Sequence, residues 1–179
     1  MTLIRTARAE DLDALQALEA RSFATDRLSR RSFANSVKLD HHVLIVATDD
    51  QDRAIGYSLL HLRQTGRTAR MHSLAVDEAH RGRGVGRDLL AASETEARRR
   101  NYLRIRLEVS RDAPATQNFY LRHGYASYRV LANHFGPGAD AVMMEKALPA
   151  GGDPSLLAQR QPSLVIVVGR GQDRKPLEE

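Results

Sequence analysis

The sequence contains no cysteine, and only 5% of its 179 residues are aromatic. The missing cysteines exclude disulfide bonds, thiolate metal ligands and a cysteine nucleophile. So few aromatic side chains argue against a base-stacking platform, and no helix-turn-helix or zinc-finger signature is present. No apolar run is long enough to cross a membrane, and the chain begins without an apolar leader. We therefore expect a cytoplasmic protein with no nucleic-acid and no membrane partner.

The composition is that of a globular protein with a basic balance. Hydrophobic residues make up 42% of the chain, charged residues 27%, and the formal net charge is +5. A chain of this length can form one domain with a sizeable core. Nearly all the basic residues are arginine, so the charge favours a polyanionic or phosphate-rich ligand.

Hydrophobic patterning predicts a mixed α/β sheet in one domain, residues 1–148. The expected strands are 2–7, 43–47, 54–62, 69–76, 103–109, 125–132 and 139–147. The expected helices are 10–20, 88–100 and a short one opened by Asp112 and Pro114. Residues 21–36 are interpreted as an irregular basic segment, with a solvated helix-loop-helix as the alternative.

The remaining residues, 149–179, are predicted to be a linker plus a C-terminal tail with one strand-like segment, 164–168. This segment could pack on a sheet edge, swap into a partner or begin a further domain. The sequence leaves these placements open, and it is compatible with a monomer or a homodimer.

A glycine- and arginine-rich stretch follows the predicted strand that ends in Leu74, Ala75 and Val76. It reads Arg81-Gly82-Arg83-Gly84-Val85-Gly86-Arg87 and leads directly into a predicted helix. Strand, glycine loop and helix together present backbone N–H groups to a phosphate. The spacing is neither a dinucleotide fingerprint nor a P-loop, and a plain strand-to-helix turn is the alternative.

Two blocks of sequence resemble a known family. The pattern Arg81-x-x-Gly84-x-Gly86 after a strand resembles the acetyl-CoA motif of the GNAT-superfamily N-acetyltransferases. The segments 107–109, 118–120 and 123–125 resemble that family's second block, and the ribosomal-protein alanine (protein N-terminal) acetyltransferases are the most similar members. The resemblance implies a mixed, mostly antiparallel seven-stranded sheet flanked by about four helices, with the fourth and fifth strands parallel.

The resemblance also implies acetyl-CoA as co-substrate and no metal. The backbone of Leu74, Ala75 and Val76 would bind the pantetheine arm. The pyrophosphate would lie against the loop and the helix start, that is, Gly82, Arg83, Gly84, Val85, Gly86 and Arg87. One departure is Ala113, which stands where relatives place a CoA-binding asparagine; Asp112 or Asn118 could replace it.

Glu108 and Tyr120 are the catalytic candidates by the same resemblance. Glu108 would accept the amine proton, directly or through water, and Tyr120, twelve residues later, would protonate the leaving thiolate. The residues alone favour a strand glutamate paired with Arg104 or Arg106, and the resemblance reverses that preference. Tyr120 could be a packed tyrosine with a satisfied hydroxyl.

The acceptor is predicted to be the α-amine of a protein or peptide. An α-amine pKa of about 8 leaves more neutral amine at pH 7 than a lysine pKa of about 10.4. The residues expected on the acceptor side are Arg27, Arg30, Asn133, His134 and Phe135. Because relatives carry N-Y-Y at 133–135, a small amine or peptide natural product is the alternative acceptor. A non-catalytic acyl-CoA-binding module is a further alternative.

Histidine is present without a metal-binding pattern. His72, His123 and His134 have no spacing typical of metal ligands. Each is interpreted as packed or solvated, and His134 lies in the segment that departs from the relatives.

Overall fold

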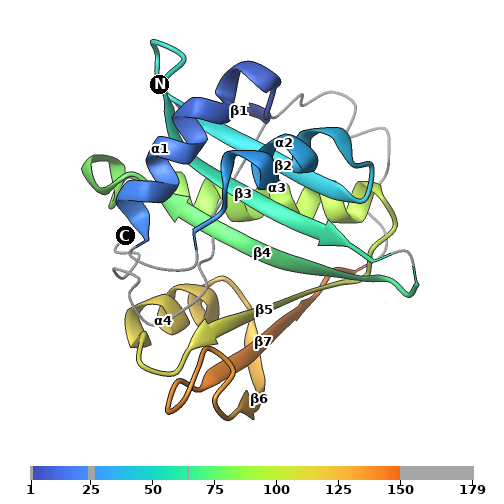
Figure 1. The fold of residues 1–179 in the computed structure, drawn as a ribbon. Helices are drawn as coiled ribbons and strands as arrows, with labels where there is room; N and C mark the ends of the chain where they lie inside the picture. The colour runs from blue at the N-terminus through green and yellow to red at the C-terminus, as the bar shows by residue number, and fades with distance from the viewer. Residues whose placement is uncertain (1, 24–26, 64, 150–179) are drawn as a thin grey trace.

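The computed structural model describes residues 2–23, 27–63 and 65–149. These residues form a seven-stranded sheet in the order β1-β2-β3-β4-β5-β7-β6 (Figure 1). The strands are β1 (Leu3–Thr6), β2 (His42–Thr48), β3 (Ala54–Leu62), β4 (Thr68–Val76), β5 (Arg104–Ser110), β6 (Ala126–Leu131) and β7 (Ala141–Ala147). Only β4 and β5 pair in parallel; all other neighbours are antiparallel. The predicted sheet is thus confirmed.

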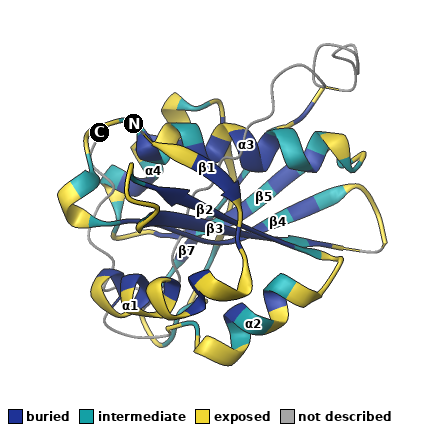
Figure 2. Cartoon of the chain, turned by 90° about the horizontal axis from the view of Figure 1, so that it is seen from above, coloured by how far each residue is buried: buried dark blue, intermediate teal, exposed yellow. Residues whose placement is uncertain are grey.

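Helices cover the two faces of this sheet, as Figure 2 shows. They are α1 (Leu12–Ser22), α2 (Arg30–Lys38), α3 (Val85–Arg99) and α4 (Pro114–Arg122), with short 3-10 turns η1 (Ala9–Asp11) and η2 (Glu78–His80). On one face, the ring of Phe33 of α2 contacts the ring of Tyr57 of β3, with a centroid distance of 5.0 Å. On the opposite face, Ser93 of α3 contacts Ser58 of β3 at 2.8 Å. The side chains of β3 therefore point alternately to α2 and α3.

The core lies on both faces of β2, β3 and β4. Six of the seven residues of β2 are buried, as expected for a strand with helices on both sides. The sheet and α3 approach each other closely at Gly56 of β3, because a Cβ there would lie 2.8 Å from Leu89 of α3. Its missing side chain lets α3 pack directly on the sheet.

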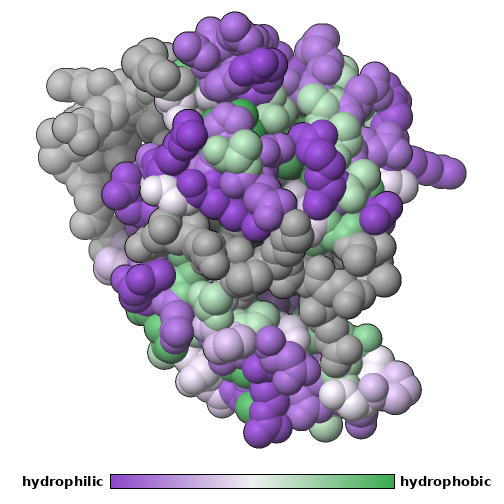
Figure 3. Space-filling view, turned by 90° about the vertical axis from the view of Figure 1, so that its left-hand side faces the viewer, coloured by the Kyte–Doolittle hydropathy of each residue, from purple (hydrophilic) through white to green (hydrophobic). Residues whose placement is uncertain are grey.

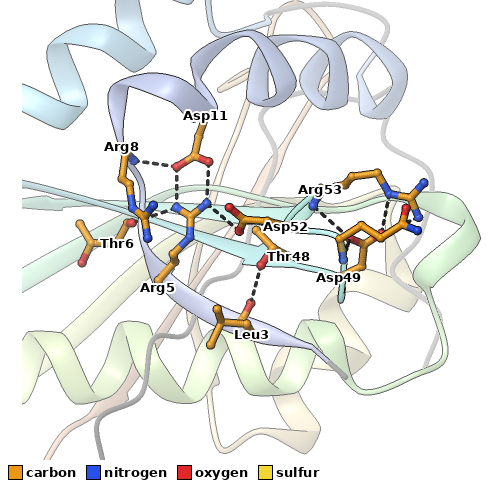
Figure 4. A network of polar contacts seen from close by, with 10 residues as sticks. Leu3, Arg5, Thr6, Arg8, Asp11, Thr48, Asp49, Asp52 and Arg53 are labelled. Carbon is orange, nitrogen blue, oxygen red and sulfur yellow. Dashed lines mark hydrogen bonds and ion pairs between the residues drawn. The ribbon is translucent and has the colours of Figure 1, made fainter.

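A buried ion cluster ties the N-terminal segment to the β2–β3 hairpin (Figure 4). The Arg5 guanidinium donates to both carboxylate oxygens of Asp11 at 2.7 and 2.8 Å, and to Asp52 at 3.1 Å. Burial raises the pKa of Asp11, but hydrogen bonds from Arg5 and the Arg8 backbone outweigh it, so the net shift is downward. The ionised carboxylate is therefore part of the folded structure.

Two predictions of local structure are corrected. For residues 21–36 the helical alternative, not the irregular segment, agrees with the structure, because α1 continues to Ser22 and α2 begins at Arg30. The Ser29 side chain accepts a hydrogen bond from the Ser32 backbone and caps α2. The helix predicted from residue 88 begins at Val85, so Val85–Arg87 of the predicted loop form its first turn.

The described surface is mainly polar. Figure 3 shows hydrophilic side chains prevailing over the described parts of one side of the molecule, with smaller apolar areas between them. Among the residues that the structure describes, no helix has both the length and the apolar character needed to span a bilayer. The predicted strand at 164–168 lies outside the described residues, and its placement stays open.

Candidate active site

The parallel strands β4 and β5 separate after a short paired segment. Their register joins Thr68–Arg104, Ala69–Ile105 and Arg70–Arg106 only, although β4 continues to Val76 and β5 to Ser110. Residues 71–76 of β4 therefore form no ladder with β5, and their outward main-chain groups are left for another partner. The predicted pantetheine contacts, Leu74 to Val76, belong to this part of β4.

A β-bulge lies where the two strands begin to separate. Leu59 of β3 pairs with Ser73 and Leu60 with Met71, so His72 is an extra residue on β4. The bulge lies two residues after Arg70, the last residue paired with β5. The change of strand geometry and the loss of pairing therefore coincide.

The glycine loop delivers backbone donors beyond the open end of β4. Gly82 and Gly84 have positive φ angles of 72° and 75°, which glycine adopts without strain. The first backbone bond of α3 runs from Asp88 N to Gly84 O at 3.0 Å. The amides of Val85, Gly86 and Arg87 precede it and form the positive end of the helix dipole.

The arginines of this loop differ in their contacts. Arg81 Nε donates to the Val76 carbonyl at 3.3 Å and ties the loop to β4. The Arg87 guanidinium pairs with the neighbouring Asp88 at 2.8 Å and lies against Gly84, whereas Arg83 is exposed. A donor set of free amides, flexible glycines and nearby guanidinium groups suits a pyrophosphate and thus fits the predicted coenzyme.

Glu108 lies on β5 beside the opening and is held by a neighbouring arginine. Arg70 of β4 donates to both of its carboxylate oxygens, with distances from 2.8 to 3.1 Å. The alternative pairing of Glu108 with Arg104 or Arg106 is wrong, because these two arginines contact Glu145 of β7 instead. Glu108 thus keeps a partly accessible, ionic carboxylate where β4 and β5 begin to part.

Tyr120 lies on α4 in an aromatic cluster. Its ring is fully buried and makes edge contacts with Phe119 and Tyr125, at centroid distances of 5.2 and 5.4 Å. Phe119 reaches the start of α3, 3.5 Å from the position a Cβ of Gly86 would take. The helix that carries Tyr120 is therefore packed beside the glycine loop.

The predicted acceptor residues lie in two separate segments. Arg27 donates from Nε to the Phe23 carbonyl, and Arg30 pairs with Asp13 of α1 at 2.5 Å. Asn133 has a positive φ of 54°, and its side chain accepts from Gly138 N at 2.6 Å, so it stabilises the β6–β7 turn. His134 is exposed and contacts the ring of Phe135. Their roles toward an acceptor stay predictions.

Comparison with known families agrees with this geometry. The model of the acetyltransferase (GNAT) family matches residues 8–125. This range begins just before η1 and ends just beyond α4. The chain belongs to the GNAT acetyltransferase family. The predicted family and enzyme class, an N-acetyltransferase, are thereby confirmed.

Two curated acetyltransferases are similar in sequence. The mycothiol acetyltransferase of Jonesia denitrificans is 30% identical over 87 residues, which are 49% of this chain and 28% of that protein. The chain therefore spans less than a third of that relative. The uncharacterized N-acetyltransferase MJ1530 of Methanocaldococcus jannaschii is 27% identical over 87% of this chain and 97% of its own length.

Solved GNAT structures share the fold. The ribosomal-protein-S18-alanine N-acetyltransferase of Escherichia coli superposes with a TM-score of 0.75, at 22% identity, over 86% of this chain and 97% of that one. The spermidine/spermine N-acetyltransferase SpeG of Vibrio cholerae gives a TM-score of 0.72, at 18% identity, over 82% and 94%. The acceptors of these proteins differ, so the shared fold leaves the acceptor of this GNAT chain open.

Sequence reasoning missed an arginine beside the GNAT opening, and also a stack of three histidines of which only His72 had been considered. Arg70 was not recognised, because its contact with Glu108 depends on the β4–β5 register. His42, His61 and His72 stack across β2, β3 and β4 with centroid distances of 4.1 Å for each neighbouring pair. Burial and the nearby His41 lower the pKa of His42, which favours an uncharged ring in the stack. No three-residue His, Asp or Glu group suited to a metal occurs among the described residues.

One shallow pocket lies away from this opening, near the beginning of β2 and the end of α3. It has a volume of about 540 Å³ and is lined by Lys38, Leu39, Asp40, His41, Leu62, Arg100 and Tyr102. Tyr102 and Arg100 follow the C-terminal end of α3, whereas the glycine loop precedes its N-terminal end. The pocket is therefore separate from the GNAT loop.

Proposed function

We propose that this protein transfers an acetyl group from acetyl-CoA directly to a primary amine, the α-amine of a protein or peptide. The observation that supports this most is the opening between β4 and β5. Glu108 lies where the strands part, and the other end of β4 leads to the α3 amides. One ligand can thus run along β4 from a phosphate-binding helix end to a carboxylate.

Acetyl-CoA would supply the activated acetyl thioester. The amides of Val85, Gly86 and Arg87 would bind its pyrophosphate, and the unpaired main-chain groups of β4 at 74–76 would bind its pantetheine arm. Arg83 is exposed and available to a further phosphate. These contacts use the main chain mostly, so they depend on loop geometry more than on side-chain identity.

Glu108 would take the proton that the amine must lose. Arg70 donates to both of its oxygens, which orients the carboxylate. The remaining lone pairs accept the proton directly or through water. No enzyme nucleophile is needed, and the chain contains no cysteine that could carry an acyl group.

Tyr120 would supply a proton to the departing sulfur. Its burial removes water from around the hydroxyl, so the proton would pass to the sulfur rather than to solvent. Since α4 packs beside the glycine loop through Phe119, the tyrosine is carried by an element next to the proposed coenzyme site.

An α-amine suits a carboxylate base. The α-amine has a pKa of about 8, whereas the lysine side chain has a pKa of about 10.4, so the α-amine loses its proton more easily at neutral pH. The fold of the alanine N-acetyltransferase neighbour supports the same class of acceptor. The fold of the spermidine/spermine acetyltransferase supports a second candidate, a small amine, together with the altered segment at Asn133–Phe135.

A panel of acceptors tests the proposal. Free CoA is measured with a thiol reagent after the protein and acetyl-CoA are mixed with peptides bearing a free α-amine, the same peptides with a blocked α-amine, and small amines. We expect release with the free peptides and none with the blocked ones. Release with small amines alone supports the second candidate. Acetyl-CoA binding without release from any acceptor would instead indicate an acyl-CoA-binding module.

A further inference from the structure

On the sheet face that carries Glu108, no helix of the described residues packs over β5, β7 and β6. The helices α1 and α2 lie over β2, β3 and β4 on this face, whereas β5, β7 and β6 continue beyond them (Figure 1). Along β5, Ile105, Leu107 and Val109 are buried toward the other face, and the alternate residues point to the open one. An acceptor whose amine reaches Glu108 must therefore extend over β7 and β6.

Strand register aligns four residues across this face. Glu108 contacts Arg70 of β4 on one side and pairs with Met143 of β7 on the other. Met143 in turn pairs with Arg129 of β6. Because directly paired residues of antiparallel strands share a face, Arg70, Glu108, Met143 and Arg129 form a cross-strand row.

The charges along and beside this cross-strand row do not cancel. Arg70 is neutralised by Glu108, and Arg104 and Arg106 share the single carboxylate of Glu145. Arg129 is exposed and has no ion-pair partner among the residues that the structure describes. Together with Glu108 and Glu145, these four arginines therefore carry an excess of two positive charges on the described part of the open face.

Arg129 lies at a defined place relative to the proposed reaction centre. Two strand spacings separate β6 from β5, so the backbone of Arg129 is about 10 Å from that of Glu108. An extended peptide rises about 3.4 Å per residue. The second and third residues of a peptide bound by its α-amine at Glu108 would thus come within reach of the Arg129 guanidinium.

We propose that the acceptor is a peptide α-amine followed at its second or third position by an acidic side chain, and that Arg129 selects for that charge. This inference rests on the proposed acetyl transfer to α-amines. It disfavours polyamines, because a polycation would bring like charges to the open face. Arg129 is a specificity residue and does not touch the reacting atoms.

The test uses three peptides that differ only at positions two and three, which are both Glu, both Gln or both Lys, with spermidine as a fourth acceptor. Turnover is measured at saturating acetyl-CoA. We expect the highest kcat/KM for the Glu peptide and the lowest for the Lys peptide, with a span of about tenfold, since exposed charge pairs contribute modestly. Equal turnover of the three peptides, or a preference for the Lys peptide or spermidine, would overturn the inference and leave acetyl transfer standing. No turnover of any peptide would overturn both.

Charge variants identify the residue. Arg129→Glu should reverse the order of the Glu and Lys peptides through KM, with kcat preserved, and Arg129→Gln should abolish the preference. Arg63→Glu is the matched control, because it makes the same charge change at an exposed position between β3 and β4. If Arg63→Glu shifts the preference as much as Arg129→Glu, net charge rather than Arg129 sets selectivity, and the inference fails.

Discussion

The ion pair between Arg70 and Glu108 allows the chemical and the structural roles of Glu108 to be separated. Glu108→Gln removes the carboxylate, whereas Arg70→Gln removes its partner and leaves the carboxylate in place. Both substitutions break the same bidentate contact of 2.8 to 3.1 Å. Any loss that comes only from breaking this contact should therefore appear in both variants.

The expected magnitudes differ between stability and activity. The Arg70 and Glu108 side chains are 29% and 14% exposed, so the pair lies between a surface and a buried ion pair. Breaking it should lower the free energy of unfolding by about 1–2 kcal/mol in either variant. Loss of a general base lowers turnover by about 10²- to 10⁴-fold, and this loss is expected for Glu108→Gln alone.

The assay is kcat/KM for CoA release with a free α-amine peptide, measured beside the thermal unfolding midpoint. We expect Arg70→Gln to lose about tenfold or less, because a misoriented carboxylate still accepts a proton. Glu108→Asp, which keeps the carboxylate on a shorter side chain, should fall between the two. Equal activity losses in Glu108→Gln and Arg70→Gln, with equal shifts in midpoint, would show that Glu108 acts only through the ion pair.

Three further substitutions test the loop, the core and the ion cluster. Gly84→Ala places a side chain at a φ of 75°, so it should lower the free energy of unfolding by about 1–2 kcal/mol and raise the Kd for acetyl-CoA measured by calorimetry. Gly86→Ala makes only an ordinary contact with Phe119 and should leave this Kd nearly unchanged. A larger effect on Kd for Gly86→Ala than for Gly84→Ala would refute the phosphate-loop geometry. Gly56→Ala sets a Cβ 2.8 Å from Leu89 and 3.1 Å from the Ala75 carbonyl oxygen. It should lower the free energy of unfolding in urea by about 1–3 kcal/mol, and an unchanged urea midpoint would mean that α3 can move away from β3. Asp11→Asn should lower the free energy of unfolding at pH 7 by about 3 kcal/mol. Because the pKa of Asp11 is lower in the folded than in the unfolded protein, the ionised carboxylate contributes fully above the unfolded pKa of about 4, and its contribution is lost as the pH falls through the folded pKa. The stabilities of variant and wild type should therefore converge only in acid.

The strands and the glycine loop could be predicted because their signals are local. The alternation of apolar and charged residues over 103–109 gives β5 directly, and positive φ at Gly82 and Gly84 agrees with a loop that needs glycine. The parallel pairing of β4 with β5 leaves no pattern in the local sequence, so it was predicted from the order of the two family blocks.

The helical parts of the site were harder to predict. In α2 only Phe33 and Ser36 are buried, too few apolar positions to give a clear helical period, although Ser29 is a recognisable N-cap. The first turn of α3 contains Gly86, which argued for a loop. It is helical nonetheless, because the Asp88 N–Gly84 O bond closes the first turn, and Phe119 of the distant helix α4 packs against it.

Contacts that depend on register could not be predicted at all. Glu108 could be placed on β5, but its partner among several arginines is decided by where β4 and β5 stop pairing. The position of Arg129 likewise follows from two successive strand pairings. Neither pairing leaves a mark in the local sequence.

The most direct test of acetyl transfer to an α-amine is tandem mass spectrometry of a peptide that offers two amines. The peptide carries a free α-amine, Glu at positions two and three, and one lysine near its C-terminus, and it is incubated with the protein and acetyl-CoA. We predict one acetyl group, located on the α-amine and absent without protein. Acetylation confined to the lysine, or an unmodified peptide although acetyl-CoA is bound, would contradict the proposed function.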